Sequence, residues 1–222
     1  MDEIKQLLKL LLDLIYPTQP KFENPVPIKD RPIEERTTRD RDIVILKDML
    51  TVNKYSRPGI AREAVLGIEV HWTGNPNTSA KANRNFFEKR KGGKEGFGST
   101  QFICDIDGDI IQMISESEIA YSSGAKSDLY TALKRSLFKK APYYYTLSVE
   151  CCVIDGKGTM TSETQDALKR LLVYLCRKYG LNHEQIYLHY ELTGKICHKW
   201  YVSNPKEWAA LKTYVRKELD EA

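Results

Sequence analysis

Two histidines and one cysteine stand where the fold could bring them around a single metal ion. His189 and Cys197 flank a short polar stretch containing Gly194, and glycine lets a backbone turn back sharply. His71 follows a largely apolar run over residues 64–70, which is typical of a strand. Two imidazoles and one thiolate can hold zinc and leave an open position for water, as catalytic zinc sites do. We therefore predict a catalytic zinc site at His71, His189 and Cys197.

Hydrolysis at such a site also needs a proton acceptor and a group that stabilises the developing oxyanion. Glu150 is a lone carboxylate within an apolar run. Because burial of an unpaired charge is costly, we expect Glu150 to face a polar cleft and to act as the proton acceptor. Lys195 and Cys197 would share one face of an extended segment, so we expect Lys195 to stabilise the oxyanion. The sequence does not indicate which residues bind substrate.

Taken singly, each of these residues has a plainer interpretation. A histidine at a strand end is more often structural than metal-bound, Cys197 could be a buried thiol and Lys195 a solvated charge. Glu150 could face water from an edge strand. Their joint occurrence favours a site. His198 is adjacent to Cys197 and would point to the opposite face of an extended chain, so we do not predict it as a ligand.

The elements that position these residues predict an α/β domain with a central mixed sheet flanked by helices. Strands are expected over 65–71, 100–105, 110–114 and 145–154, and Asp107-Gly108 is a strong hairpin signal between the second and third. Helices are expected over 79–91, over 161–179 and from Pro205 onward. In the first of these helices, the spacing predicts that Ala82, Phe86 and Phe87 face inward.

The N-terminal region is expected to be separate from this domain, with a boundary between 1–41 and 42–222. Leucines and isoleucines at helical spacing predict an amphipathic helix over residues 3–15. A proline-rich linker follows, up to Arg41. The helix would dock on the main domain or on a second copy of the chain, which would make a homo-oligomer.

Composition excludes several classes of function. The chain has 222 residues, a net charge of +4 and five cysteines. This charge is too small to indicate a nucleic-acid-binding protein, and the odd number of cysteines without framework spacing argues against a disulfide scaffold. No apolar run approaches the ~18 residues of a transmembrane segment. The leucine-rich start is interrupted by Lys9 and Asp13 and lacks a signal-peptide cleavage site, so we expect synthesis in the cytoplasm.

Together these motifs resemble the zinc-dependent N-acetylmuramoyl-L-alanine amidases of phage endolysins and bacterial autolysins, whose catalytic domain shares its fold with peptidoglycan recognition proteins. The resemblance covers roughly residues 50–218. The matching stretches are residues 56–59 (SRPG), 68–76 (IEVHWTGNP), 148–150 (SVE) and 189–197 (HYELTGKIC).

The resemblance implies that His71, His189 and Cys197 bind zinc, that Glu150 is the catalytic carboxylate and that Lys195 stabilises the transition state. It also implies that the substrate is peptidoglycan, that the amide between N-acetylmuramic acid and L-alanine is cleaved, and that the protein acts on the cell wall after release. The sequence departs from the family pattern at Gln101, where a histidine is common, and at His198, where the family usually has proline. It also departs at residues 120–124 (AYSSG, which includes Ser122), where the family often has Trp-His before a glycine.

Two other functions compete with this interpretation. A non-catalytic peptidoglycan-binding module could keep the same fold, and the altered 120–124 segment is consistent with it. Cys197 argues against it, because non-catalytic relatives typically lack that ligand. A thiol hydrolase using Cys152 or Cys197 is less favoured, since nothing in the sequence marks an orienting partner for either thiol.

Overall fold

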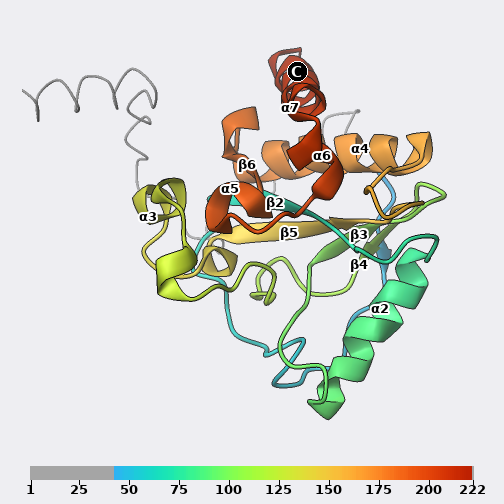
Figure 1. Cartoon of the computed structure of the whole chain (residues 1–222), viewed down its shortest axis with the longest axis vertical. Helices are drawn as coiled ribbons and strands as arrows, with labels where there is room; N and C mark the ends of the chain where they lie inside the picture. Colours follow the sequence, from blue (N-terminus) through green and yellow to red (C-terminus); the bar gives the residue numbers. More distant parts are fainter. Residues whose placement is uncertain (1–42, 222) are drawn as a thin grey trace, which may run out of the picture. The chain divides into compact units, whose positions relative to one another are not determined.

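The protein is described by a computed structural model that covers residues 43–221, apart from the side chain of Ser127. Its described part contains a six-stranded mixed sheet with the strand order β1-β4-β3-β5-β2-β6 (Figure 1). Strands β3 and β4 are antiparallel, whereas every other neighbouring pair is parallel. The strands are β1 Leu46–Lys47, β2 Gly67–Trp72, β3 Phe102–Cys104, β4 Ile110–Gln112, β5 Thr146–Cys151 and β6 Ile186–Leu188.

Helices lie on both faces of this sheet. Figure 1 shows α4 and α7 on one side of the sheet and α2 on the other. The α-helices are α2 Ala80–Lys89, α3 Ala132–Leu137, α4 Ser162–Tyr179, α5 His189–Thr193, α6 Lys199–Ser203 and α7 Pro205–Asp220. Short 3-10 helices span Arg90–Gly92, Ser127–Leu129, Pro142–Tyr144 and His183–Gln185.

The long helix α4 begins and ends where its local sequence dictates. The hydroxyl of Thr161 accepts the backbone N–H of Thr164 at 3.0 Å, which satisfies a donor that the first helical turn leaves free. Gly180 ends the helix in the left-handed conformation (φ 62°), which glycine adopts without the steric penalty of a side chain. Both ends agree with the helix predicted over 161–179.

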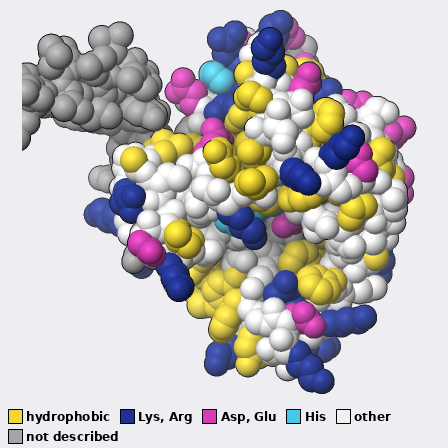
Figure 2. Space-filling view, viewed as in Figure 1, with side chains coloured by type: hydrophobic (Ala, Val, Ile, Leu, Met, Phe, Trp, Pro, Cys, Tyr) yellow, Lys and Arg dark blue, Asp and Glu magenta, His cyan; other side chains and the backbone are white. Residues whose placement is uncertain are grey.

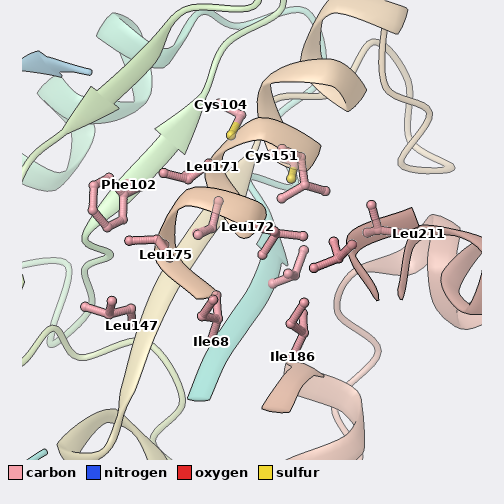
Figure 3. Close-up of a cluster of buried hydrophobic side chains, with 14 of the residues drawn as sticks. Ile68, Phe102, Cys104, Leu147, Cys151, Leu171, Leu172, Leu175, Ile186 and Leu211 are labelled. Atoms are coloured by element: carbon pink, nitrogen blue, oxygen red, sulfur yellow. The ribbon is translucent and has the colours of Figure 1, made fainter. Parts of the chain in front are cut away.

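The main hydrophobic core lies between the sheet and α4. Leucines of α4 at helical spacing point at the apolar face of the strands, which includes Ile68 and Leu147 (Figure 3). Leu211 and Val215 of α7 extend the same cluster. A second, smaller cluster on the other face packs Ala80 and Phe87 of α2 against residues of β3 and β4.

The two faces of the central strands differ in chemistry, and this difference creates the site. Alternate residues of a strand point to opposite faces, so Ile68 and Val70 enter the core while Glu69 and His71 point the other way. Strand β5 follows the same alternation, and its polar residues lie directly beside those of β2: Glu69 pairs with Ser148, and His71 pairs with Glu150.

Most of the predicted elements are present, and the expected mixed α/β architecture is confirmed. The hairpin of β3 and β4 turns at Gly108, whose φ of 92° requires glycine. The inward orientation predicted for two side chains of α2 was wrong. Ala82 and Phe86 are exposed, whereas Ala80 and Asn83 are buried, because the helix rests on the sheet through the face that carries Ala80, Asn83 and Phe87.

The amphipathic helix expected over residues 3–15, the linker and the homo-oligomer contact proposed for them lie outside the described residues. Within residues 43–221, no helix is both long and apolar enough to span a membrane.

Candidate active site

The strand half of the site consists of two neighbouring side chains at the carboxyl ends of parallel strands. His71 lies on β2 and Glu150 on β5, and they are direct partners in the register. Partners in a parallel pair project from the same face, so the imidazole and the carboxyl group are brought side by side. Both residues line the cleft described below.

The loop half is built by the segment that follows β6. His189 is the first residue of α5, and Gly194 ends that short helix with a φ of 72°. The chain then returns, and the backbone N–H of Tyr190 donates to the carbonyl of Cys197 at 3.0 Å. This closure places Cys197 next to His189, as the sequence predicted from the glycine between them.

His71, His189 and Cys197 converge on one point. One potential ligand atom from each residue lies within 4.8 Å of the other two, and all three residues are buried. The sulfur of Cys197 is 3.7 Å from Nδ1 of His71. Tetrahedral zinc with ordinary Zn–N and Zn–S bond lengths would place such atoms about 3.6 Å apart. The donor set and its spacing therefore fit zinc, while the assignment of these residues as ligands stays a prediction.

The electrostatic environment also suits a cation. Burial, together with the nearby His71 and Lys195, lowers the pKa of His189 to about 2, so this imidazole is neutral, as a metal ligand must be. Burial opposes a charge on His71, but its contacts with Cys197 and Glu69 outweigh burial and raise its pKa well above the usual value. These surroundings therefore favour a positive charge on the imidazole of His71.

The environment of the Glu150 carboxyl group suits proton transfer. Its Oε2 is buried and has no hydrogen-bond partner within residues 43–221. Burial raises the pKa of this carboxyl group to about 7, although His71 and Lys195 oppose the shift. A carboxyl group that titrates near neutral pH can both accept and donate a proton there.

The metal-free protein should lose stability through Glu150 as the pH rises. The pKa of Glu150 in the folded protein, about 7, lies above the pKa of an unfolded glutamate. The stabilising contribution of the protonated carboxyl group is therefore complete below the unfolded-state pKa and is lost as the pH rises through the folded-state pKa. Relative to Glu150→Gln, the free energy of unfolding of the parent protein should fall by roughly 2–3 kcal/mol between about pH 5 and pH 8. Urea unfolding of both proteins after chelator treatment measures this difference. An equal pH dependence in the two proteins would contradict the raised pKa.

These groups lie in a cleft of about 760 Å³, a size typical of ligand-binding sites. Figure 2 shows a face that is hollowed near its centre, with charged and histidine side chains in or beside the hollow and hydrophobic side chains around it. Lys195 is exposed and lines the cleft. Aromatic rings form part of the lining: Phe97 contacts Tyr121 edge-on at 5.3 Å between ring centroids, and Tyr121 contacts Tyr143 in the same way at 5.6 Å.

The three departures from the family pattern lie in different environments. Gln101 is buried outside the cleft lining, where its Oε1 accepts the backbone N–H of Ser148 at 2.8 Å. His198 is buried between Trp72 and Tyr201 and lies outside the group of three potential ligands His71, His189 and Cys197, called the metal-type group below. Ser122 lines the cleft and, like Ser123, contacts Glu69.

Two further residues contribute to the site that were not predicted from the sequence. Phe86 lines the cleft instead of packing inward, which the helical pattern alone could not show. Glu69 lies within the contact range of His71, with 3.3 Å between its Oε2 and Nε2 of the imidazole. A signal for Glu69 was present, because it is a lone carboxylate in an apolar run, as Glu150 is.

Comparison with known proteins agrees with this geometry. A family model described as N-acetylmuramoyl-L-alanine amidase matches residues 61–204. The chain is 33% identical over 184 residues to the N-acetylmuramoyl-L-alanine amidase CwlL of Bacillus licheniformis, covering 80% of this chain and 47% of the relative. It is 26% identical over 183 residues to the N-acetylmuramoyl-L-alanine amidase BlyA of Bacillus subtilis, covering 79% of this chain and 48% of the relative. The chain thus spans about half the length of the curated relatives it matches.

Solved structures share the fold. The catalytic domain of XlyA superposes with a TM-score of 0.59 at 20% identity, covering 77% of this chain and 99% of that domain. PlyL superposes with a TM-score of 0.61 at 18% identity, covering 78% of this chain and 98% of PlyL. These structural matches confirm the fold class expected from the resemblance.

Proposed function

Because this chain belongs to the N-acetylmuramoyl-L-alanine amidase family, we propose that it hydrolyses the amide between N-acetylmuramic acid and L-alanine in peptidoglycan with the help of zinc. His71, His189 and Cys197 would hold the metal. The observation that carries the proposal is the convergence of these three buried side chains beside Glu150 in one cleft.

Zinc bound there would supply Lewis-acid polarisation and a nucleophile at neutral pH. Glu150 takes a proton from the attacking water and then gives it to the amide nitrogen that leaves as the amino group of L-alanine. The ammonium group of Lys195 stabilises the negative charge that develops on the scissile carbonyl oxygen. The products are a carboxylic acid on the muramic acid lactyl group and the free amine of L-alanine. Transfer of the acid's proton to the amine then gives a carboxylate and an ammonium group, so atoms and protons balance.

The aromatic lining of the cleft offers a surface for the apolar faces of the substrate. We expect Phe97→Ala to raise KM for wall fragments roughly fivefold and to leave kcat unchanged, since the ring would contribute about 1 kcal/mol to binding and does not contact the reacting groups. Phe97 is 56% exposed, so its removal should not unfold the protein. Val44→Ala is a matched control, because Val44 is 68% exposed and does not line the cleft. An unchanged KM in Phe97→Ala would show that this part of the cleft lining does not bind the substrate.

The decisive experiment is the digestion of purified cell walls, followed by mass spectrometry and end-group analysis. New amino termini of L-alanine without new reducing sugar ends are expected, and a chelator should abolish them until zinc is restored. New reducing ends would identify a glycosidase and overturn the proposal. Activity that persists in the chelator would instead indicate a thiol hydrolase.

The non-catalytic binding module makes the opposite prediction, namely wall binding without turnover at any zinc concentration. Cys197 supports the enzyme, because its sulfur completes the metal-type group with the two histidines. Action on the cell wall follows from the proposed substrate.

A further inference from the structure

Glu69 is a completely buried carboxylate behind the metal-type group. It lies on β2, two positions before His71 and on the same face of the sheet. Its Oε1 accepts the hydroxyl of Ser123 at 2.8 Å, and its Oε2 accepts the hydroxyl of Ser122 at 3.3 Å. Oε2 is also 3.3 Å from Nε2 of His71. Buried charges persist when they are compensated in this way.

These contacts determine which nitrogen of His71 is available to a metal. A carboxylate only accepts hydrogen bonds, so the contact with Glu69 places the hydrogen of His71 on Nε2. In the neutral imidazole, Nδ1 then carries a lone pair, and Nδ1 is the atom that faces the sulfur of Cys197 at 3.7 Å. A carboxylate that holds the distal nitrogen of a ligating histidine fixes both its tautomer and its ring orientation.

We propose that Glu69, held in place by Ser122 and Ser123, is a positioning residue that aligns His71 for zinc and sets the zinc affinity of the site. This inference rests on the zinc site of the proposed function. It also gives a role to the Ser122-Ser123 pair, which departs from the family pattern and which the proposed chemistry does not use.

The segment that carries the two serines is itself fixed. The N–H of Tyr121 donates to the hydroxyl of Ser99 at 2.9 Å, and the N–H of Ser99 donates back to the carbonyl of Tyr121 at 3.1 Å. Just before this segment, the carbonyl of Glu118 accepts the side-chain amide of Gln101 at 3.1 Å. The segment that carries the two serine hydroxyls is therefore held beside Glu69 by hydrogen bonds of its own backbone.

A purely structural role is the competing explanation. Glu69 acts electrostatically on the buried Arg62, whose guanidinium donates to the backbone carbonyls of Glu116, Glu118 and Tyr143. If Glu69 served only to balance this charge, its replacement would lower the free energy of unfolding and leave zinc binding unchanged. The two roles can therefore be separated by measuring both quantities.

The test compares Glu69→Gln, Ser123→Ala and the control Glu88→Gln, which makes the same chemical change in a surface ion-pair cluster on α2. Zinc affinity is measured by competition with a chromogenic chelator, and the geometry of the site by the absorption spectrum of the cobalt-substituted protein. We expect zinc binding to weaken about 10–100-fold in Glu69→Gln, less in Ser123→Ala and not at all in Glu88→Gln. The cobalt spectrum should change in the first two variants only.

Zinc affinities and cobalt spectra like those of the parent protein in both Glu69→Gln and Ser123→Ala would overturn the inference, even if stability fell. Should Glu69→Gln fail to fold, Ser123→Ala decides alone, because it keeps the carboxylate and removes only its support. A parent protein that binds zinc but does not cleave walls would refute the proposed activity and leave this inference intact.

Discussion

Replacing Glu150 by glutamine should lower kcat for wall hydrolysis by about 10²–10⁴-fold, the usual contribution of a general acid–base group. Glutamine has nearly the same shape and cannot carry the transferred proton. Because Glu150 does not belong to the metal-type group, the variant should bind zinc like the parent protein. Steady-state kinetics on wall fragments and zinc analysis of the purified protein measure both quantities.

Glu184→Gln provides the matched control for this variant. Glu184 is exposed and does not line the cleft, so its replacement should leave both activity and zinc content unchanged. Full turnover in Glu150→Gln would remove Glu150 from the mechanism. Loss of zinc together with activity would instead assign it to metal binding.

Replacing His189 by alanine should abolish stoichiometric zinc binding, and with it essentially all activity. Only His71 and Cys197 would remain, and two protein ligands are fewer than catalytic zinc sites use. Since His189 lies at the start of α5 and not in the main core, the variant should still fold. Zinc content after dialysis, together with circular dichroism, tests both expectations.

His183→Ala is the natural comparison, because His183 lies just before β6 and outside the metal-type group. This variant should retain zinc and activity. A His189→Ala protein that kept a full complement of zinc would refute the ligand assignment.

Local sequence signals predicted the elements of the fold well. Thr161 and Gly180 delimit α4 through caps that depend only on neighbouring residues, and Gly108 turns the hairpin for the same reason. Orientation was harder to predict. The pattern over 79–91 placed Phe86 inward, yet which face of α2 rests on the sheet depends on strands far away in the sequence.

The residues of the site were predicted more by their chemical type than by their spacing in the sequence. Histidine, cysteine and a lone strand carboxylate suggested His71, Cys197 and Glu150, and the structure brings these residues together. Glu69 is also a lone carboxylate in an apolar run and carries the same signal. The partnership of Glu69 with Ser123 was beyond the sequence, since it joins a strand to a loop 54 positions away through side-chain geometry alone.

A metal ion bound at the loop that Tyr190 and Cys197 close would also affect the stability of the fold. His189 and Cys197 belong to the C-terminal part of the chain, whereas His71 belongs to an interior strand 126 positions before Cys197. An ion bound by all three residues would link segments that are distant in the sequence. Its effect on stability would resemble that of a covalent cross-link between the same segments. Zinc binding would then stabilise the folded protein against unfolding and, under the proposed function, also complete the catalytic site.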